Sequence, residues 1–238
     1  MRLLAIGDVH GQLDRLKTLL GSLCLQHDDQ LVMLGDYIDR GPDSSGVIDT
    51  LIQLKMDYPH TIFLRGNHEQ MLLDTLFELG IVADWKPLRA YVGSPDLSMS
   101  TDTFLYEANG GLATLLSYMT DSKQAYRGKT SAYQMIPQEH IEFLMQTTFH
   151  YRYLHYLFVH AGINEADPLG EKYGPYDLLW RRKVDTCRLD GRELTVVHGH
   201  TPCVVPLFNE REINLDTGAG HGRVLSCCDV RTGKIWQA

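Results

Sequence analysis

Two carboxylates and a guanidinium lie within five residues in the stretch Gly-Asp-Tyr-Ile-Asp-Arg-Gly, residues 35–41. Asp36, Asp39 and Arg40 follow the apolar run 31–34, which is typical of a buried strand. In open α/β sheets ligands bind just beyond the carboxyl ends of strands, so these side chains are candidates for a site. A solvated Asp- and Gly-rich turn has the same composition, and this stretch alone does not decide between the two.

The arrangement recurs at two other predicted strand ends. Asp8 and His10 follow the apolar run 3–6, and in extended backbone residues two apart point to one side, so both could reach one metal ion. Asn67 and His68 follow a third such run, and as sequence neighbours they point in different directions. One of them could therefore bind a metal while the other faces a substrate.

Two histidines extend this group of side chains. His160 ends the apolar run 156–159, and His200 follows the predicted strand 194–197. A lone histidine is more often structural, but six metal-binding side chains at strand ends beside glycines are improbable by chance. The six residues are Asp8, His10, Asp36, Asn67, His160 and His200. Oxygen and nitrogen ligands without thiolate favour a pair of divalent ions such as Mn, Fe or Zn, which about 3.5–4 Å apart could share and activate a water.

Three consecutive strand–helix units position the first part of this group. Three strand–loop–helix repeats indicate a largely parallel sheet covered by helices. The predicted strands are 3–6, 31–34 and 61–64, and the helices are 13–23, 45–55 and 70–79. Further helices are predicted at 109–119, 137–145 and 177–182.

The second half consists mainly of short strands, which predict a mixed or antiparallel second sheet. These strands are 151–154, 156–159, 194–197, 204–208, 212–215, 223–229 and 234–236. Because no low-complexity linker separates the halves, we expect one α/β domain over residues 1–238, with two packed mixed sheets flanked by helices. Residues 81–107 lack periodicity and are predicted to be a long excursion, either a lid over the site or an insertion without a role.

Charge and composition exclude some functions. The chain has 22 Lys+Arg against 30 Asp+Glu, which argues against a broad electrostatic contact with nucleic acid or an anionic membrane. Five scattered cysteines lack C-x-x-C spacing and are expected to be reduced thiols. The first apolar run is too short for a signal peptide, and no run reaches the roughly 18 residues that span a bilayer, so we expect a cytoplasmic protein. The oligomeric state is left open.

The motifs together resemble those of the PPP-type serine/threonine protein phosphatases, most closely the small bacterial and phage enzymes. They are Gly-Asp-Val-His-Gly at 7–11, Gly-Asp-Tyr-Ile-Asp-Arg-Gly at 35–41, Gly-Asn-His-Glu at 66–69, His-Ala-Gly at 160–162 and Gly-His-Thr-Pro at 199–202. This resemblance implies the calcineurin-like metallophosphoesterase fold. It also implies removal of phosphate from phosphoserine or phosphothreonine, and also from phosphotyrosine, in a protein or peptide. The attacking group would be a hydroxide bridging two divalent ions, Mn foremost, with Fe, Zn, Ni or Mg as alternatives.

The resemblance also assigns roles to individual residues. The first metal would be bound by Asp8, His10 and Asp36, and the second by Asp36, Asn67, His160 and His200. His68 would be the general acid, with Asp39 orienting its ring and keeping it protonated. The phosphoryl oxygens would be bound by Arg40, Arg182 and Asn67, with Arg65 as a weaker candidate. Arg181 is interpreted as a surface residue.

One departure from the family pattern and one rival function leave alternatives open. His198 stands where protein phosphatases tend to have an apolar residue, while many other metallophosphoesterases use a His-x-His pair there, so it could be a seventh ligand. The rival function is a dinucleoside polyphosphate hydrolase or another nucleotide phosphoesterase. Such dinucleoside hydrolases tend to lack the carboxylate of Asp39 and to be longer in the second half. A metal-holding scaffold without turnover is disfavoured, because all six ligands and His68 are present.

Overall fold

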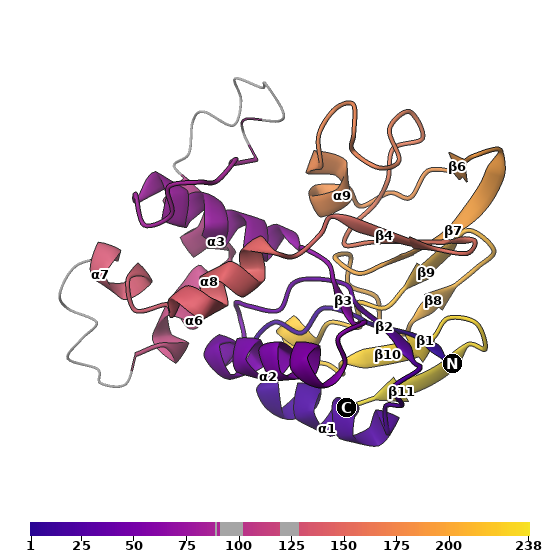
Figure 1. Ribbon diagram of the computed structural model, residues 1–238, viewed down its shortest axis with the longest axis horizontal. Helices are drawn as coiled ribbons and strands as arrows, with labels where there is room; N and C mark the ends of the chain where they lie inside the picture. The colour runs from indigo at the N-terminus through magenta and orange to yellow at the C-terminus, as the bar shows by residue number, and fades with distance from the viewer. Residues whose placement is uncertain (89, 91–101, 120–128) are drawn as a thin grey trace.

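The computed structural model describes residues 1–88, 90, 102–119 and 129–238. Within these residues two β-sheets pack face to face, and helices cover their outer sides (Figure 1). This is the α/β calcineurin-like architecture expected from the sequence. No helix in the described ranges is both long enough and apolar enough to cross a membrane.

The first sheet has the strand order β11-β10-β1-β2-β3. Strands β1 (Leu3–Ile6), β2 (Gln30–Met33) and β3 (Ile62–Phe63) are parallel, as predicted. Strands β10 (Ser226–Asp229) and β11 (Lys234–Gln237) complete it, and β10 is antiparallel to β1. The sequence-based assignment of these two strands to the second sheet is wrong. Every residue of β10 is buried, so β10 requires a neighbour on each side, but strand periodicity does not reveal which neighbour it has.

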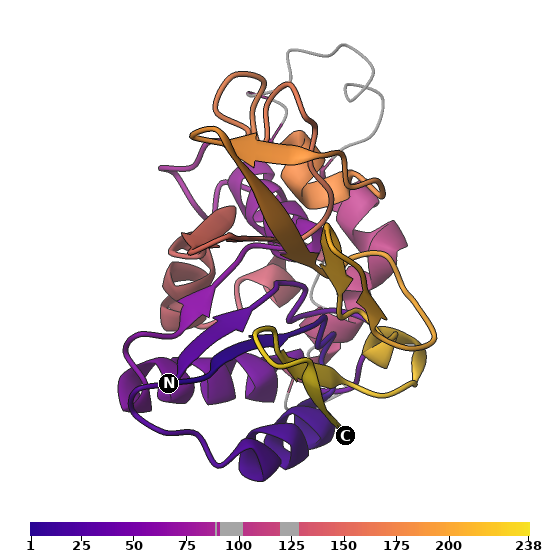
Figure 2. The same ribbon diagram turned by 90° about the vertical axis from the view of Figure 1, so that its right-hand side faces the viewer.

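The second sheet is mixed, as expected. It has the order β4-β5-β7-β9-β8, and β5, β7 and β9 run parallel while the two edge strands are antiparallel. The strands are β4 (His150–Tyr153), β5 (Tyr156–Val159), β7 (Arg192–His198), β8 (Leu207–Phe208) and β9 (Glu212–Asn214). The short strand β6 (Cys187–Leu189) pairs with β7 and was not predicted. Figure 2 shows β7, the long orange strand, lying above the indigo and purple strands of the first sheet.

The alternation of side chains along β1 explains how the layers pack. Leu3 and Ala5 point to one face and join Val197 in the core between the two sheets. Leu4 and Ile6 point to the other face and pack against the helices. Since both faces of β1 are buried, the residues that directly follow it are held at a fixed place at the edge of the sheet.

The helices nearest the first sheet follow its strands. They are α1 (Leu13–Leu23), α2 (Ser44–Asp57) and α3 (Asn67–Glu78). The helix α3 begins three residues earlier than predicted, because Gly66 is its N-cap and the Glu69 side chain accepts the Gly66 N–H. Asn67 and His68 therefore lie in the first helical turn and not in a loop.

The helices α5 (Asp102–Tyr106), α6 (Leu112–Ser117), α7 (Lys129–Tyr133) and α8 (Gln138–Met145) come from the middle of the chain. A π-type turn, residues Glu107–Gly111, joins α5 to α6. Of the predicted excursion 81–107, residues 89 and 91–101 lie outside the described residues. Its last part is not a loop, because residues 102–106 form α5, which packs against α3. The helix α9 (Tyr176–Trp180) lies beside the second sheet (Figure 1).

Candidate metal centre

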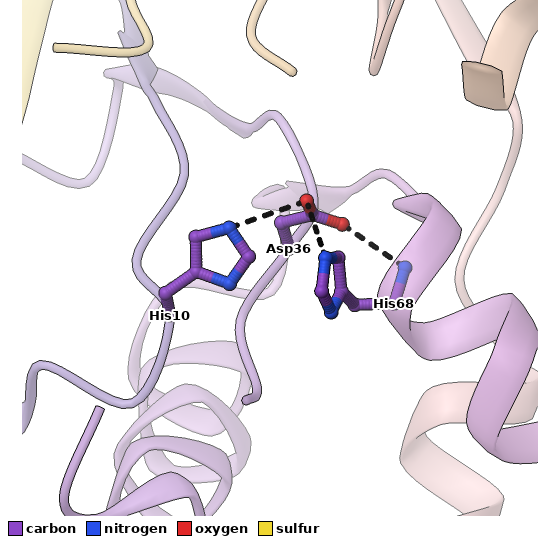
Figure 3. Close-up of side chains that lie close together, drawn as sticks. All are labelled: His10, Asp36 and His68. Atoms are coloured by element: carbon purple, nitrogen blue, oxygen red, sulfur yellow. Dashed lines mark hydrogen bonds and ion pairs between the residues drawn. The ribbon is translucent and has the colours of Figure 1, made fainter. Parts of the chain in front are cut away.

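The carboxylate of Asp36 is the centre of the candidate site. It is 2 % exposed and lies just beyond the end of β2. Its Oδ2 atom is 3.4 Å from Nε2 of His10 and 3.8 Å from Nε2 of His68, and its Oδ1 is 3.4 Å from Nε2 of His160. Figure 3 shows the rings of His10 and His68 both directed at this carboxylate. Asp36 therefore faces imidazoles from both sheets of the molecule.

Of the predicted first ligand group, His10 faces one of these oxygens, together with His68. His10 places Nδ1 2.9 Å from the carbonyl of Ile38, so Nδ1 carries the proton and Nε2 presents a lone pair toward Asp36. The Asp8 carboxylate accepts the backbone N–H of His200 at 3.1 and 3.2 Å. A Cβ at Gly199 would lie 2.0 Å from Oδ1 of Asp8, so only glycine fits there.

The predicted second ligand group converges on Asn67. Its Oδ1 is 3.0 Å from Nε2 of His160 and 3.0 Å from Nδ1 of His200. The other ring nitrogen of His160, Nδ1, lies 2.9 Å from the carbonyl of Leu34 and donates its proton there. The Nε2 lone pair of a neutral His160 thus faces the oxygen lone pairs of Asn67 and Asp36. A divalent cation between these atoms would satisfy all of them, so the donor set fits a metal.

The electrostatics of the group also fit cations. Burial alone would raise the pKa of Asp36, but positive charge at the positions of His160, His68 and His10 outweighs burial and lowers this pKa. Burial lowers the pKa of His10 and of His160, which keeps both rings neutral as metal ligands must be. It lowers the pKa of His200 to about 3.

Two carboxylates are close enough to Asp8 to affect its ionisation. Burial, followed by the charges of Asp216 and Asp36, raises the pKa of Asp8 well above its usual value. Bound cations would offset this repulsion. Asp216 lies two residues after the end of β9 and was not predicted as a site residue. No sequence motif identifies an acidic residue at this position as part of a site.

His68 and Asp39 form the predicted acid pair. Nδ1 of His68 is 2.7 Å from Oδ2 of Asp39, and both residues are 0 % exposed. Burial lowers the pKa of His68, but Asp36 and then Asp39 more than compensate, so the pKa is raised. Nε2, on the other side of the ring, faces the Asp36 carboxylate.

The backbone is strained at this site. Of eight non-glycine residues with positive φ in the described parts of the chain, five belong to the predicted site. They are His10 (47°), Asp36 (51°), Asp39 (72°), Arg40 (65°) and His200 (62°). Left-handed backbone costs of order 1–3 kcal/mol at a non-glycine residue, and it clusters at functional sites.

Glu69 stabilises part of this strained backbone, and it was not predicted. Its Oε1 accepts the N–H of Tyr37 at 2.8 Å, and its Oε2 accepts the N–H groups of Asp36 at 2.9 Å and Gly66 at 2.8 Å. Burial and then the charge of Asp36 raise the pKa of Glu69 to about 7, while the hydrogen bonds from Gly66 and Tyr37 oppose the shift. The sequence signal was available: Glu69 occupies the third helical position, where a glutamate closes a capping box.

Of the predicted phosphate-binding arginines, Arg40 faces the site. Arg40 places Nη1 2.7 Å from Nε2 of His10 and Nη2 3.0 Å from Nε2 of His68. Because a guanidinium only donates, these contacts are hydrogen bonds only while both imidazoles are neutral, with the proton on Nδ1 and Nε2 accepting. Arg182 is exposed, and its charge contributes to the lowered pKa of His200. Arg181 instead pairs with acidic neighbours, which fits its interpretation as a surface residue.

Arg65 is not brought to the site, which corrects the prediction that it binds phosphate. Its Nε donates to Oγ1 of Thr147 at 3.0 Å, and its Nη2 donates to the carbonyls of Met145 at 3.0 Å and Thr147 at 2.9 Å. The guanidinium also lies over the rings of Trp85 and Phe149. Arg65 therefore ties the start of α3 to the segment after α8.

His198 also has protein partners for both ring nitrogens. Nε2 is 2.9 Å from Oε1 of Glu212, and Nδ1 is 2.9 Å from the carbonyl of Gly199. Both nitrogens are used in these contacts, so His198 supports the loop that carries His200 and is not part of the donor set.

Comparison with known proteins agrees with this geometry. A family model described as calcineurin-like phosphoesterase matches residues 1–221. The bis(5'-nucleosyl)-tetraphosphatase PrpE [asymmetrical] of Oceanobacillus iheyensis is 27 % identical over 253 residues, covering 95 % of this chain and 87 % of that protein. The serine/threonine-protein phosphatase PP2A-like PPG1 of Candida albicans is 37 % identical over 103 residues, 42 % of this chain and 24 % of that protein.

A solved structure extends the likeness to the whole fold. The crystal structure of a candidate diadenosine tetraphosphatase superposes with a TM-score of 0.65 at 21 % identity. The match covers 100 % of this chain and 92 % of that one. At this identity the likeness concerns the fold alone.

Proposed function

Since this chain belongs to the calcineurin-like phosphoesterase family, we propose that it hydrolyses phosphate monoesters of serine and threonine in proteins or peptides. The substrate would be a phosphoprotein or phosphopeptide, with phosphotyrosine as a further target. The reaction would require two divalent cations, manganese being the first to test.

The ligands would divide between the two cations as the converging atoms suggest. Asp8, His10 and Asp36 would hold one cation, and Asp36, Asn67, His160 and His200 the other. When bound, two such cations activate water and offset the charge of the phosphoryl group. Asp36 would serve both, because its two oxygens face opposite sets of imidazoles.

The arginines and His68 would act on the substrate itself. Arg40 has a planar guanidinium at the site and would bind two phosphoryl oxygens, with Arg182 and the Asn67 amide as further phosphate-binding groups. His68 would be the general acid. With Nδ1–H held by Asp39, Nε2 is the atom that would deliver a proton to the leaving oxygen.

The His68–Asp39 contact of 2.7 Å is the observation that carries this proposal. A serine or threonine alkoxide is a very basic leaving group, so its departure needs a proton donor in the transition state. A nucleoside phosphate leaves as an anion whose second pKa is about 6, and it gains little from such a donor. A buried, oriented imidazole is thus better matched to alkyl phosphate esters than to phosphoanhydrides.

A dinucleoside tetraphosphate hydrolase is the second candidate. The observation that favours it is the relative from Oceanobacillus iheyensis, which matches nearly the full length of this chain and is described as acting on bis-nucleosyl tetraphosphates. The match to the serine/threonine phosphatase of Candida albicans covers less than half of the chain.

The two candidates differ in their preferred substrate. Purified protein loaded with Mn²⁺ is given a phosphoserine or phosphothreonine peptide, a phosphotyrosine peptide and a bis-nucleoside tetraphosphate at matched concentrations. We expect kcat/KM for the phosphoserine or phosphothreonine peptide to exceed that for the tetraphosphate by at least about tenfold, or about 1.4 kcal/mol. A tenfold preference for the tetraphosphate would replace the first candidate by the second.

A further inference from the structure

The carboxylate of Asp39 has partners other than His68. Oδ1 accepts a hydrogen bond from the hydroxyl of Tyr106 at 2.8 Å and another from Oγ1 of Thr114 at 2.6 Å. All four side chains are 0 % exposed. The two carboxylate oxygens therefore have different partners, because Oδ2 meets the imidazole while Oδ1 accepts from one hydroxyl on α5 and one on α6.

Thr114 holds Asp39 at two points. Its Oγ1 donates to the carboxylate and also accepts the backbone N–H of Asp39 at 2.9 Å. The Oγ of Ser44 accepts the same N–H at 3.0 Å. Because Asp39 has a strained φ of 72°, these contacts stabilise a backbone conformation that would otherwise relax.

The turn between Tyr106 and Thr114 has a shape that brings both hydroxyls to one carboxylate. It is a π-type turn that breaks at Gly110, where φ is 103°. A Cβ at Gly110 would lie 3.2 Å from Cγ of Arg40, and a Cβ at Gly111 would lie 2.4 Å from the ring of Tyr106. The two glycines therefore let the turn approach Arg40 and let the Tyr106 ring pack beneath it. Turns of this type inside helices are frequent at functional sites.

The hydroxyl of Tyr106 is a permanent donor in this arrangement. Burial, followed by the negative charge of Asp39, raises the pKa of Tyr106 well above its ordinary value. The phenol therefore keeps its proton. Two fixed donors on Oδ1 determine the plane of the Asp39 carboxylate and thus the direction in which Oδ2 meets His68.

We propose that Tyr106 and Thr114 are positioning residues for the general acid, acting through Asp39 to hold His68 at the leaving oxygen. This inference rests on the proposed phosphomonoesterase function. It assigns a role in catalysis to the segment 106–114, which provides none of the metal ligands. The segment acts by fixing a proton donor and by contacting the backbone of Arg40.

The test compares leaving groups. Thr114→Val, Thr114→Ser and Tyr106→Phe are each loaded with Mn²⁺ and assayed on aryl phosphates whose phenols range from weakly to strongly acidic. Thr114→Val is expected to lower kcat about 10- to 100-fold on esters of weakly acidic phenols, the loss typical when the support of a site residue is removed. It should change kcat less than about twofold on esters of strongly acidic phenols, with KM little affected, because these need little protonation. Thr114→Ser restores the hydroxyl and should restore most of kcat.

Two controls separate positioning from general destabilisation. Thr75→Val removes an equally buried threonine hydroxyl, which bonds only the carbonyl of Met71 within α3, and should leave the leaving-group dependence unchanged. Tyr156→Phe is the control for Tyr106→Phe, because it removes the hydroxyl of a buried tyrosine that donates to the carbonyl of Val230. Crystal structures of the Mn²⁺-loaded proteins give a readout other than activity: the Asp39 carboxylate should be rotated in Thr114→Val and unchanged in Thr75→Val.

His68→Asn in the same series distinguishes failure of this inference from failure of the proposed function. If His68→Asn shows the leaving-group dependence and neither Thr114→Val nor Tyr106→Phe does, the positioning role is overturned and the acid role stands. If the loss of kcat in His68→Asn does not depend on the leaving group, the acid role fails, and the positioning role fails with it. Equal losses for Thr114→Val on all esters, without recovery in Thr114→Ser, would also overturn the inference.

Discussion

The carboxylate of Glu69 accepts the backbone N–H of Asp36 at 2.9 Å, and the same oxygen accepts the N–H of Gly66 at 2.8 Å. One buried side chain thus fixes both the turn after β2 and the first turn of α3. The turn carries the central carboxylate of the site, and the helix carries Asn67 and His68. The relative position of ligands from two different strand–helix units therefore depends on Glu69.

Replacing Glu69 by Gln is expected to weaken both folding and metal binding. The amide keeps the size of the side chain, but it presents an NH₂ group to backbone N–H groups that need acceptors. We expect the free energy of unfolding to fall by about 1–3 kcal/mol, measured by urea denaturation, and metal content to fall in elemental analysis. Glu142→Gln, an exposed change on α8, is the control and should alter neither. Full metal content in Glu69→Gln would contradict the role given to this residue.

The Asp36 carboxylate should be indispensable for the cations. Asp36→Asn removes the negative charge that faces His10 and His160 from either oxygen. We expect the purified variant to retain fewer than two equivalents of Mn²⁺ after dialysis, and isothermal titration should show weakened binding. Retention of both ions with unchanged affinity would show that Asp36 is not shared between them.

His68→Asn should separate metal binding from turnover. The variant lacks the imidazole that meets Asp39, but it keeps every predicted metal ligand. Metal stoichiometry should stay near that of the wild type, while kcat on esters with poor leaving groups should fall by about 10²–10⁴. Undiminished kcat would remove His68 from the acid role, and loss of one metal would make it a ligand.

His198 should affect stability and not metal stoichiometry. Since its ring nitrogens contact Glu212 and the Gly199 carbonyl, His198→Asn should reduce the free energy of unfolding by about 1–2 kcal/mol. Elemental analysis should still find two ions per chain. A missing ion in this variant, with the six other ligands intact, would identify His198 as a seventh ligand.

The ion pair between Arg2 and Asp29 should make the free energy of unfolding depend on pH in the acidic range. Burial would raise the pKa of Asp29, but hydrogen bonds from Arg2 outweigh it and lower this pKa from 3.8 to about 2. A lowered pKa stabilises the fold fully above pH 3.8, and this contribution is lost as the pH falls through about 2.

The measurement is urea denaturation of wild type and Asp29→Asn over a pH series. Asp29→Asn should lower the free energy of unfolding by up to about 2 kcal/mol at neutral pH, and the difference should shrink as the pH falls below about 4. Asp14→Asn, at an exposed position in α1, is the control and should show no such convergence. A constant difference across the series would mean that the contacts of Asp29 do not depend on its charge.

The sequence predicts most of the metal centre because its residues follow strands. Asp8, Asp36 and Asn67 come after three consecutive parallel strands, and the carboxyl ends of such strands must meet at one edge of a sheet. His160 and His200 obey the same rule in the second sheet. The position of β10 could not be predicted in this way, because an antiparallel strand can pair with a strand from any part of the chain.

The side chains that support the site are harder to predict. Tyr106 lies in a helix where an aromatic residue is normally a core residue, and nothing in the spacing shows that its hydroxyl reaches Asp39. Arg65 precedes the Gly-Asn-His-Glu motif and has the right charge, but its backbone direction sends the guanidinium toward residues 145–147. Arg65 was predicted to bind phosphate because it is close to the motif in sequence, but its side chain points away from the site.

Strand β1 acquires its second neighbour long after its own synthesis, because Leu4 pairs with Asp229. Until β10 emerges from the ribosome, one edge of β1 is bare, and the loop carrying Asp8 and His10 is anchored on one side only. Bare strand edges are sites of misassembly in nascent polypeptides. Ribosome-bound chains halted before residue 226 lack β10 and are therefore expected to need chaperone protection.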